Sequence, residues 1–213
     1  TMATSGQGFI EGNAWNYGLF VPHDVPALVE AMGGPETFGR HLDELFTMEL
    51  ADEHFAHTED ITRDGIMGNY VHGNEPGHHI IYLYNWTDRP WRTFQQARLV
   101  MLNMYGTGPA GLCGNDDLGQ MSAWYIFSAL GFYPVCPGSP QYALSAPLVR
   151  RADLALGDGK VLAIRTENQV PGNLFVKEVR LNGITLGTPF VDHADLAQGG
   201  ELVFVLGPKS LQR

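Results

Sequence analysis

Segments with a helical pattern alternate with glycine-rich corners along the first two thirds of the chain, and this alternation limits the folds open to it. Apolar residues recur at helical spacing over residues 24–32, 36–50, 90–105 and 121–130. A further helix is expected to begin at Pro76, whereas the polar residues 51–72 are expected to form a loop. Because the corners carry the polar residues, the pattern is typical of an (α/α) barrel that presents a site at one end.

The sequence after Pro134 has a different pattern, with short apolar runs typical of strands. The runs lie at residues 142–145, 161–165, 174–181 and 202–206. Asn182-Gly183, between Leu181 and Ile184, predicts a hairpin turn. This part of the sequence contains no cluster of catalytic residue types. We therefore predict an α+β protein in which residues 1–138 form a helical unit and residues 139–213 a β-rich, sandwich-like extension.

The charge balance restricts the partners. The formal net charge is -10 and the sequence pI is about 5.1. Nucleic acids and anionic membranes are bound by basic patches, so neither is expected as a partner, whereas a cation or a neutral sugar is compatible with this charge. No apolar run reaches the roughly 18 residues of a membrane span. The chain opens with Thr1-Met-Ala-Thr-Ser-Gly, which reads as a trimmed start, so the lack of a recognisable signal peptide says little about the compartment.

Three Gly-Asn corners each lie beside a carboxylate. They are Glu11-Gly12-Asn13, Gly73-Asn74-Glu75 and Gly114-Asn115-Asp116, with Asp117 following the third. We expect these corners to form the walls of one site. For the third corner the alternative is a capping loop, because Asp and Asn just before a helix satisfy its free N–H groups.

Glu11 is followed by the aromatic residues Trp15, Tyr17 and Phe20. Aromatic side chains can exclude water from a carboxyl group and raise its pKa, as a general acid near neutral pH requires. Their rings also offer faces on which sugars stack. The alternative is that these residues belong to the core and lie beside a charge at its edge.

Asn74 and Glu75 place an amide oxygen and a carboxylate side by side, and Ca²⁺ prefers such oxygen ligands. The corner lacks the spacing of an EF-hand loop, so further ligands would come from distant segments. The alternative is that Glu75 lies in the first turn of the helix expected at Pro76.

The chain has two cysteines, Cys113 and Cys136, which flank the helix predicted at 121–130. A chain that runs out along this helix and back can bring them together, and a disulfide would then brace the Asp116-Asp117 loop. The sequence equally allows two buried thiols.

Several longer motifs resemble glycoside hydrolase family 92, the calcium-dependent, inverting exo-α-mannosidases of bacteria. The motifs are Glu11-Gly-Asn-Ala-Trp, Val21-Pro-His-Asp, Gly73-Asn-Glu-Pro-Gly-His-His and Gly114-Asn-Asp-Asp-Leu-Gly-Gln-Met-Ser-Ala-Trp-Tyr. The resemblance implies an (α/α)6 barrel preceded by an N-terminal β-sandwich, of which this chain is the C-terminal portion. It also implies a mannose-terminated glycan, such as an N-glycan, as substrate, Ca²⁺ as cofactor, and an extracellular or periplasmic location. The N-terminal portion, with the rest of the barrel, is expected as a separate fragment or chain.

Carried over residue by residue, the resemblance makes Glu11 the general acid and Asp117 the general base, with Asp116 as the second candidate for the base. An inverting pair stands roughly 6.5–9.5 Å apart to admit a water. Many relatives carry a second aspartate at the position of Asn115, and an amide there cannot take a proton. The resemblance further implies that Asn74 and Glu75 bind calcium. The residues expected to bind substrate are Trp15, His72, Gly73 and Asn115.

Gly73 departs from the family pattern. Relatives that cut α-1,2 links usually carry Glu there, as the resemblance suggests, and glycine removes both a hydrogen-bond partner for a neutral sugar and a charge that would repel phosphate. This favours a mannose-1-phospho-6-mannose (phosphodiester) uncapping activity with His72 as a donor. The alternatives are a neutral substitution in an α-1,2-mannosidase, a calcium-dependent sugar-binding module without catalysis, and a phosphorylase-like enzyme, for which the supply of basic residues is thin.

Overall fold

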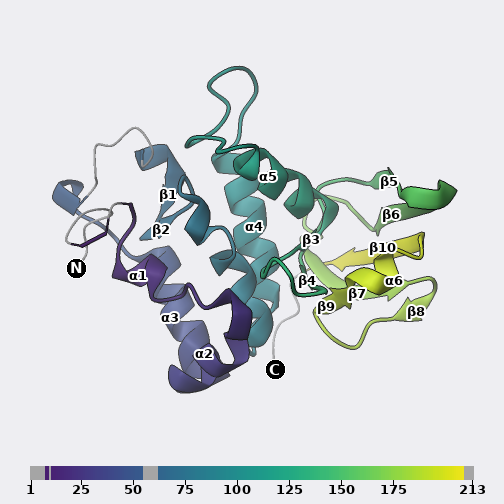
Figure 1. Cartoon of the computed structure of the whole chain (residues 1–213), viewed down its shortest axis with the longest axis horizontal. Helices are drawn as coiled ribbons and strands as arrows, with labels where there is room; N and C mark the ends of the chain where they lie inside the picture. Colours follow the sequence, from purple (N-terminus) through teal and green to yellow (C-terminus); the bar gives the residue numbers. More distant parts are fainter. Residues whose placement is uncertain (1–7, 10, 55–61, 209–213) are drawn as a thin grey trace.

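The computed structural model describes residues 8–9, 11–54 and 62–208, and it joins a helical part to a β-rich part (Figure 1). The helical part contains α1 (Ala14–Tyr17), α2 (Val25–Ala31), α3 (Pro35–Thr47), α4 (Trp91–Asn103) and α5 (Gln120–Leu130). Its 3₁₀ helices are η1 (Pro22–Asp24), η2 (Asp52–His54), η3 (Arg63–Gly65), η4 (Glu75–Gly77) and η5 (Ile80–Trp86). The helices predicted at 24–32, 36–50, 90–105 and 121–130 are confirmed, although α3 ends earlier than expected, at Thr47.

The turn between α2 and α3 follows from the local sequence. The Asp24 side chain accepts a hydrogen bond from the Ala27 N–H at 3.1 Å and so caps the start of α2. Gly33 and Gly34 then have φ angles of 93° and 88°, a left-handed conformation that glycine adopts without steric cost. Pro35 occupies the first position of α3, where its missing N–H removes no helical hydrogen bond.

The segment around and after Pro76 is helical, but it forms two 3₁₀ helices, η4 and η5, where the sequence predicts a single helix. Every residue of η5 from Ile80 to Asn85 is buried, so the segment lies inside the helical part and has no exposed face. Packing on all sides therefore determines its conformation more than helical propensity does.

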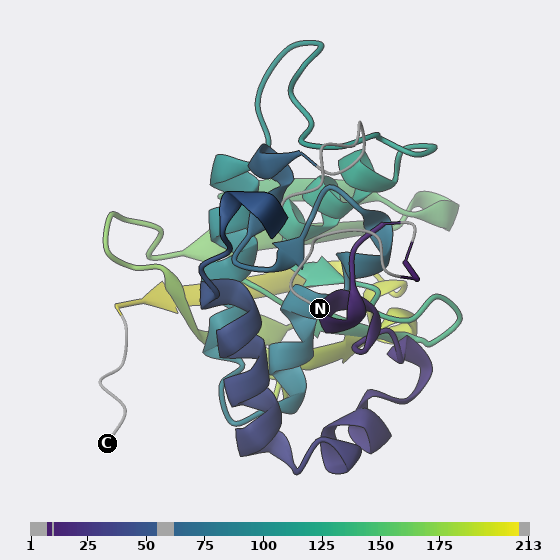
Figure 2. The ribbon, with the colours of Figure 1, turned by 90° about the vertical axis from the view of Figure 1, so that its left-hand side faces the viewer.

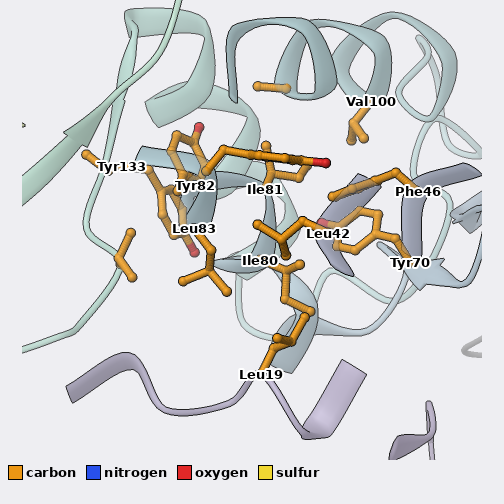
Figure 3. Packing of buried hydrophobic residues seen from close by; sticks show 14 of the residues in the cluster. Leu19, Leu42, Phe46, Tyr70, Ile80, Ile81, Tyr82, Leu83, Val100 and Tyr133 are labelled. Atoms are coloured by element: carbon orange, nitrogen blue, oxygen red, sulfur yellow. The ribbon is translucent and has the colours of Figure 1, made fainter. Parts of the chain in front are cut away.

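The main core surrounds η5. Ile80, Ile81 and Leu83 pack with residues from several other elements, including Leu42 of α3 and Val100 of α4 (Figure 3). Ile80, Ile81, Leu83, Leu42 and Val100 all have zero exposed area. Fully burying one such side chain is worth roughly 1.5–3 kcal/mol relative to leaving it exposed. The core thus holds α3, α4 and η5 in a fixed arrangement beneath the polar corners.

Part of the predicted loop at 51–72 is a short antiparallel hairpin of β1 (Ile66–Met67) and β2 (Tyr70–Val71). Residues 55–61 of that loop lie outside the described residues. The hairpin precedes the Gly73 corner directly and Tyr70 and Val71 are buried, so the corner starts from a fixed strand.

The β-rich part contains two sheets. The first is antiparallel, in the order β3-β4-β9, and consists of β3 (Phe132–Tyr133), β4 (Gln141–Leu144) and β9 (Phe190–Asp192). The second has the order β5-β6-β10-β7-β8 and consists of β5 (Arg151–Ala155), β6 (Val161–Glu167), β10 (Gly200–Gly207), β7 (Phe175–Leu181) and β8 (Ile184–Thr185). In this sheet β6 and β10 are parallel and the other pairs are antiparallel. Two short helical turns, η6 (Gly157–Gly159) and α6 (His193–Leu196), lie between strands.

The strands predicted in this part are confirmed, and so is the hairpin turn. Asn182 and Gly183 have φ angles of 50° and 82° and connect β7 to β8, as a two-residue turn with both φ values positive requires. The sequence did not reveal β3, β5 or β9. The β5 sequence Arg-Ala-Asp-Leu-Ala has low strand propensity and forms an exposed edge, where charged residues discourage further pairing.

The two sheets share one apolar cluster, as expected of a sandwich-like extension. Phe132 and Leu144 of the first sheet lie in the same buried cluster as Ile164 and Phe204 of the second. Because β3 pairs with β4, the first sheet extends across the predicted boundary at residue 138. The division into two domains and the (α/α)6 barrel remain predictions.

Figure 2 shows the helical part in front of the sheets, with the loop between α4 and α5 extending away from the helices. Tyr105 and Leu112 form an isolated antiparallel bridge at the base of this loop. Cys113, which follows it, and Cys136 are both free thiols, Cys113 buried and Cys136 partly buried, so the structure shows no disulfide between them. Among the described helices, none is long and apolar enough to cross a membrane.

Candidate active site

The first corner begins α1. The Asn13 side-chain oxygen accepts a hydrogen bond from the Trp15 N–H at 2.9 Å and caps this short helix. Gly12 has a φ angle of 69°, and a Cβ atom there would lie 3.2 Å from the Tyr17 ring. Glycine therefore lets the chain turn sharply between Glu11 and the helix, and it leaves Glu11 partly buried at the start of the turn.

Three buried asparagines connect this corner to the β1–β2 hairpin, and we call Asn13, Asn16 and Asn69 the asparagine clamp. Asn13 Nδ2 donates to Asn69 Oδ1 at 2.9 Å, and Asn16 Nδ2 donates to the Asn69 carbonyl at 2.8 Å. Asn16 Oδ1 accepts from the Val71 N–H at 3.1 Å. Both ends of the Asn16 amide are therefore bonded to backbone groups of the hairpin, which fixes the orientation of the amide. The clamp in this way holds the first corner, which carries Glu11, against the strand that leads into the Gly73 corner.

The second corner presents Asn74 and Glu75. The Asn74 amide nitrogen donates to the Tyr17 hydroxyl at 3.4 Å, which joins this corner to the first. Glu75 Oε1 is buried and receives no hydrogen bond from any of the residues that the structure describes. Burial, which has the largest effect, and the nearby carboxylates of Asp117 and Glu11 together raise the pKa of Glu75 to about 7. The carboxylates of the first and third corners are thus near enough to Glu75 to affect its pKa.

The third corner separates its two aspartates. Asp116 accepts hydrogen bonds from the Ser122 N–H at 2.9 Å and the Ser122 hydroxyl at 3.1 Å, so its carboxylate caps the start of α5. The capping alternative considered from the sequence therefore applies to Asp116. Asp117 is exposed and turns toward Glu75 instead.

The backbone at Asp117 is strained. Asp117, Leu118 and Gly119 have φ angles of 45°, 58° and 90°, so three successive residues adopt a left-handed conformation. This costs roughly 1–2 kcal/mol for each residue that carries a Cβ atom. Such strain persists where the surrounding structure enforces it, which is common at functional sites.

Glycine allows the second and third corners to touch. A Cβ atom on Gly114 would lie 2.4 Å from the Gly73 carbonyl oxygen, closer than atoms can approach. The two backbones therefore pack directly against each other. This contact places the loop that carries Asp117 beside the loop that carries Glu75.

Glu75 and Asp117 line a cleft of about 510 Å³. Its remaining polar lining comes from His79 and Gln120, and the rest is apolar or aromatic, from Phe20, Pro22, Pro76, Tyr133, Pro134, Val135 and Pro137. Asn115 is exposed and lines a different cleft of about 460 Å³, together with Asp64 and Tyr105. Asn115 thus lines a different cleft from Glu75 and Asp117, and its substrate role remains a prediction.

His72 and Trp15 also have partners away from this cleft. His72 is fully buried, with Nδ1 2.7 Å from the Tyr70 hydroxyl and Nε2 2.8 Å from the Tyr105 hydroxyl. Burial, with His78 nearby, lowers the pKa of His72 well below its usual value. Trp15 stacks on His41 with ring centroids 4.8 Å apart. The substrate roles of these two residues remain predictions, and their observed contacts are with the protein.

Gln120 and His78 were not recognised from the sequence as site residues. Gln120 Nε2 lies 3.2 Å from the Tyr133 hydroxyl and 3.2 Å from His78 Nδ1. Burial lowers the pKa of His78 to about 4, so its ring is neutral. The sequence feature that could have identified Gln120 as a site residue is its position, three residues after Asp117 and at the first position of α5.

The donor set at Glu75 fits a hard cation only in part. Among the described residues, no three His, Cys, Asp or Glu side chains converge closely enough to hold a metal ion by themselves. The buried Glu75 oxygen without a hydrogen-bond donor is nevertheless the kind of ligand that Ca²⁺ prefers, and the Asn74 amide oxygen is a second. A calcium ion here would take its other ligands from backbone oxygens, water or substrate.

Comparison with known proteins covers nearly the whole chain. The sequence profile of the glycosyl hydrolase family 92 catalytic domain matches residues 1–208. A protein from Arthroderma benhamiae, described as an uncharacterized secreted glycosidase, is 26% identical over 210 residues, which make up 97% of this chain and 25% of that protein.

Solved structures of this family have a similar fold. The GH92 alpha-mannosidase BT3965 from Bacteroides thetaiotaomicron, in complex with mannoimidazole, is 38% identical with a TM-score of 0.89 over 98% of this chain and 28% of that chain. The GH92 inverting mannosidase BT2199 from Bacteroides thetaiotaomicron VPI-5482 is 35% identical with a TM-score of 0.81 over 97% of this chain and 29% of that chain. The chain thus spans less than a third of the length of these relatives. Since the family profile covers almost all of its residues, the chain belongs to glycosyl hydrolase family 92.

Proposed function

We propose that the polypeptide containing this chain hydrolyses terminal α-mannosides by general acid and base catalysis with inversion. The observation that carries the proposal is that Glu75 and Asp117 line one cleft and that the carboxylates of Asp117 and Glu11, from the two other corners, both raise the pKa of Glu75. The relatives described as mannosidases point to mannose as the sugar. Because the chain spans less than a third of those relatives, the remainder of the polypeptide is expected to complete the site.

The two acid-base roles fall to different corners. Glu11 protonates the oxygen of the glycosidic bond as the C1–O bond breaks, and Asp117 takes one proton from the water whose oxygen bonds to C1 on the opposite face. Asp116 is left to hold α5, because Ser122 occupies both of its oxygens. Trp15 and Asn115 are the residues we expect to contact the sugar once the polypeptide is complete.

Calcium is expected at the second corner, held by Glu75 and Asn74. When bound, it supplies a positive charge that engages sugar hydroxyls and orients the ring. Glu75 binds either a proton or the ion. Because its pKa is raised to about 7, Glu75 is largely protonated below about pH 7 when no cation is present. The carboxylate is thus free for a cation only after it has lost that proton.

The linkage is proposed to be a mannose-1-phospho-6-mannose phosphodiester. Gly73 brings no charge or side chain to the second corner, and the described residues that line the cleft include no acid besides Glu75 and Asp117. The alternative is an α-1,2-mannosidase. Hydrolysis rates on mannose-α-1-phospho-6-mannose and α-1,2-mannobiose decide between them, because faster cleavage of the neutral disaccharide contradicts the phosphodiester.

The second class of function is a calcium-dependent sugar-binding module. Such a module needs no acid and base, so the presence of Glu11 and Asp117 near Glu75 favours the enzyme. A phosphorylase-like enzyme is less well supported, because the described residues lining the cleft include no Lys or Arg, and Arg89 and Arg92 pair with Asp43 elsewhere.

The test of the proposal is release of mannose, followed by NMR. β-Mannose must appear first if the reaction inverts, and a calcium chelator must slow the release. Glu11→Gln should lower kcat by roughly 10²–10⁴-fold while sugar binding persists. Binding without turnover in the wild-type polypeptide would instead favour the sugar-binding module. A secreted location is proposed from the relative described as secreted.

A further inference from the structure

Gln120 has a fixed orientation at the start of α5. Its Nε2 lies 3.2 Å from the Tyr133 hydroxyl and 3.2 Å from His78 Nδ1. The backbone N–H of Gln120 donates to the Asp117 carbonyl at 3.2 Å, across the left-handed residues Leu118 and Gly119. The side chain is therefore held at one end by the protein and tied at its backbone to Asp117.

The hydrogen bond on the far side of His78 determines which end of the amide faces the ring. His78 Nε2 lies 3.0 Å from the His72 carbonyl oxygen, which can only accept, so Nε2 carries a proton. His78 is 1% exposed, and a buried imidazole without a carboxylate against it is neutral. Its Nδ1 is therefore an acceptor, and the group that faces it must be the NH₂ of Gln120.

The other end of the amide is consequently a carbonyl oxygen that points away from His78 and Tyr133. Gln120 lines the same cleft as Glu75 and Asp117. Among the described residues no donor bonds to Gln120 Oε1, and this atom is not one of the buried oxygens left without a partner, so it is open to the cleft. An acceptor thus stands beside Asp117 at a site where water is the reactant.

We propose that Gln120 is a catalytic residue that orients the attacking water. This inference rests on the proposed function. The water has two protons: Asp117 removes one as the water oxygen bonds to C1, and Gln120 Oε1 accepts a hydrogen bond from the other, which stays on the product hydroxyl. The C1–O bond to the leaving group breaks, its electron pair goes to the leaving oxygen, and Glu11 protonates that oxygen.

The orientation matters because a water held by one acceptor can rotate. Two acceptors, Asp117 and Gln120, fix both O–H bonds and leave a lone pair of the water directed elsewhere, toward C1. Holding a reactant in the geometry of attack lowers the barrier by removing orientational freedom before the reaction. Gln120 has no proton to exchange at neutral pH, so its role is in positioning the water and not in titration.

The test uses the complete polypeptide that contains this chain, with wild type compared to Gln120→Leu. Leucine has a similar size and removes the acceptor. We expect kcat to fall by about 100-fold, with KM, the Kd for calcium and the shape of the pH profile of kcat all unchanged. A calcium Kd raised by the same factor as kcat falls would identify Gln120 as an ion ligand and overturn the proposal. Unchanged kcat would overturn it as well.

A second variant tests the orientation without removing Gln120. Tyr133→Phe removes one of the two groups that hold the NH₂ end, so kcat should fall by about fivefold at constant KM, which is what one hydrogen bond of roughly 1 kcal/mol contributes. The matched control is Tyr82→Phe. Tyr82 stacks on Tyr133 at 4.8 Å and donates or accepts with Ser128 at 2.6 Å, so it loses a buried hydroxyl but has no contact with Gln120.

The outcomes separate the inference from the proposed function. If wild type releases no mannose, both fail. If wild type is active and Tyr133→Phe loses no more kcat than Tyr82→Phe, the orientation of Gln120 is irrelevant and this inference alone is overturned. A loss confined to Gln120→Leu and Tyr133→Phe, at constant KM, supports it.

Discussion

The carboxyl groups of Glu75 and Asp117 interact at one cleft, although the two residues lie 42 positions apart in the sequence. Two carboxylates that interact in this way repel each other unless one carries a proton. Glu75 carries it, because burial and the negative charges of Asp117 and Glu11 together raise the pKa of Glu75 to about 7. The proximity of the second and third corners therefore makes the site sensitive to protons.

The first prediction concerns stability and pH without metal. Glu75 binds its proton more tightly in the folded protein than in the unfolded chain, where the pKa is near 4.5. Its contribution to stability is therefore complete below about pH 4.5 and is lost as pH rises through about 7. We expect Tm of the wild type to fall, relative to Glu75→Gln, over that interval in a chelator-treated sample.

The control for this measurement is Glu30→Gln, which changes an exposed glutamate on α2. Its Tm should follow that of the wild type at every pH. Parallel curves for wild type and Glu75→Gln from pH 4 to pH 8 would contradict the assignment of the proton to Glu75.

The second prediction concerns calcium, which must displace that proton. If Glu75 is a ligand, one proton leaves for each ion bound below about pH 7, so the calcium Kd should tighten by about tenfold per pH unit there and level off above it. Isothermal titration calorimetry at pH 5, 6 and 8, in buffers of different ionisation enthalpy, measures both Kd and the number of protons released. A Kd that does not vary across this range would remove Glu75 from the ligand set.

The third prediction concerns the strained turn between Asp117 and α5. Gly119 has a φ angle of 90°, and a Cβ atom there would meet no other atom within 4 Å. Gly119→Ala therefore tests the backbone conformation alone and should destabilise the protein by about 1–2 kcal/mol in urea unfolding. Gly187→Ala, also without neighbours within 4 Å but with no such φ angle, should change the free energy of unfolding by less than about 0.5 kcal/mol. Equal effects of the two substitutions would show that the turn is not strained.

The sequence predicted the local elements and the identity of the corners well, because both depend on nearby residues. Helical spacing located α2 to α5, and Asn182-Gly183 located the β7–β8 turn. Each Gly-Asn corner combines a glycine, which permits a tight turn, with a neighbouring carboxylate, which is a candidate for catalysis or ion binding. We therefore expected the loops that carry Glu75 and Asp117 to approach each other, because each contains such a corner. That their carboxyl groups interact could be established only from the fold.

The orientation of individual side chains could not be predicted, because it depends on residues far away in the sequence. His72 was expected to serve as a donor in the site, yet hydroxyls from β2 and from the loop after α4 take both of its ring nitrogens. Asp116 and Asp117 are neighbours, but one caps α5 and the other faces Glu75, and only the left-handed backbone at Asp117 separates these roles. Gln120 could not be identified from the sequence, because a glutamine at the start of a helix matches no catalytic motif. Its orientation depends on the contacts with His78 and Tyr133, which only the fold shows.

The fourth prediction concerns the asparagine clamp, which fixes Glu11 from a distance. Asn16→Ala leaves the buried Val71 N–H and Asn69 carbonyl without their partners, each of which costs about 1–3 kcal/mol. The loosened corner should also misplace Glu11, so turnover should fall most for substrates whose leaving group needs protonation. We expect kcat/KM for an alkyl α-mannoside to drop by at least about tenfold more than kcat/KM for an aryl α-mannoside with an acidic leaving group.

The matched control for this prediction is Asn85→Ala, because Asn85 is equally buried and equally well bonded. It donates to the carbonyls of Leu144 and Pro189 at 2.9 and 3.1 Å and accepts from the Thr93 hydroxyl at 2.7 Å, where the helical part meets the first sheet. The control should lower Tm by a similar amount while changing the two kcat/KM values by the same factor. A clamp that served stability alone would make the two variants indistinguishable in this ratio, whereas a dependence on the leaving group found only for Asn16→Ala identifies the clamp as the part of the fold that positions the general acid.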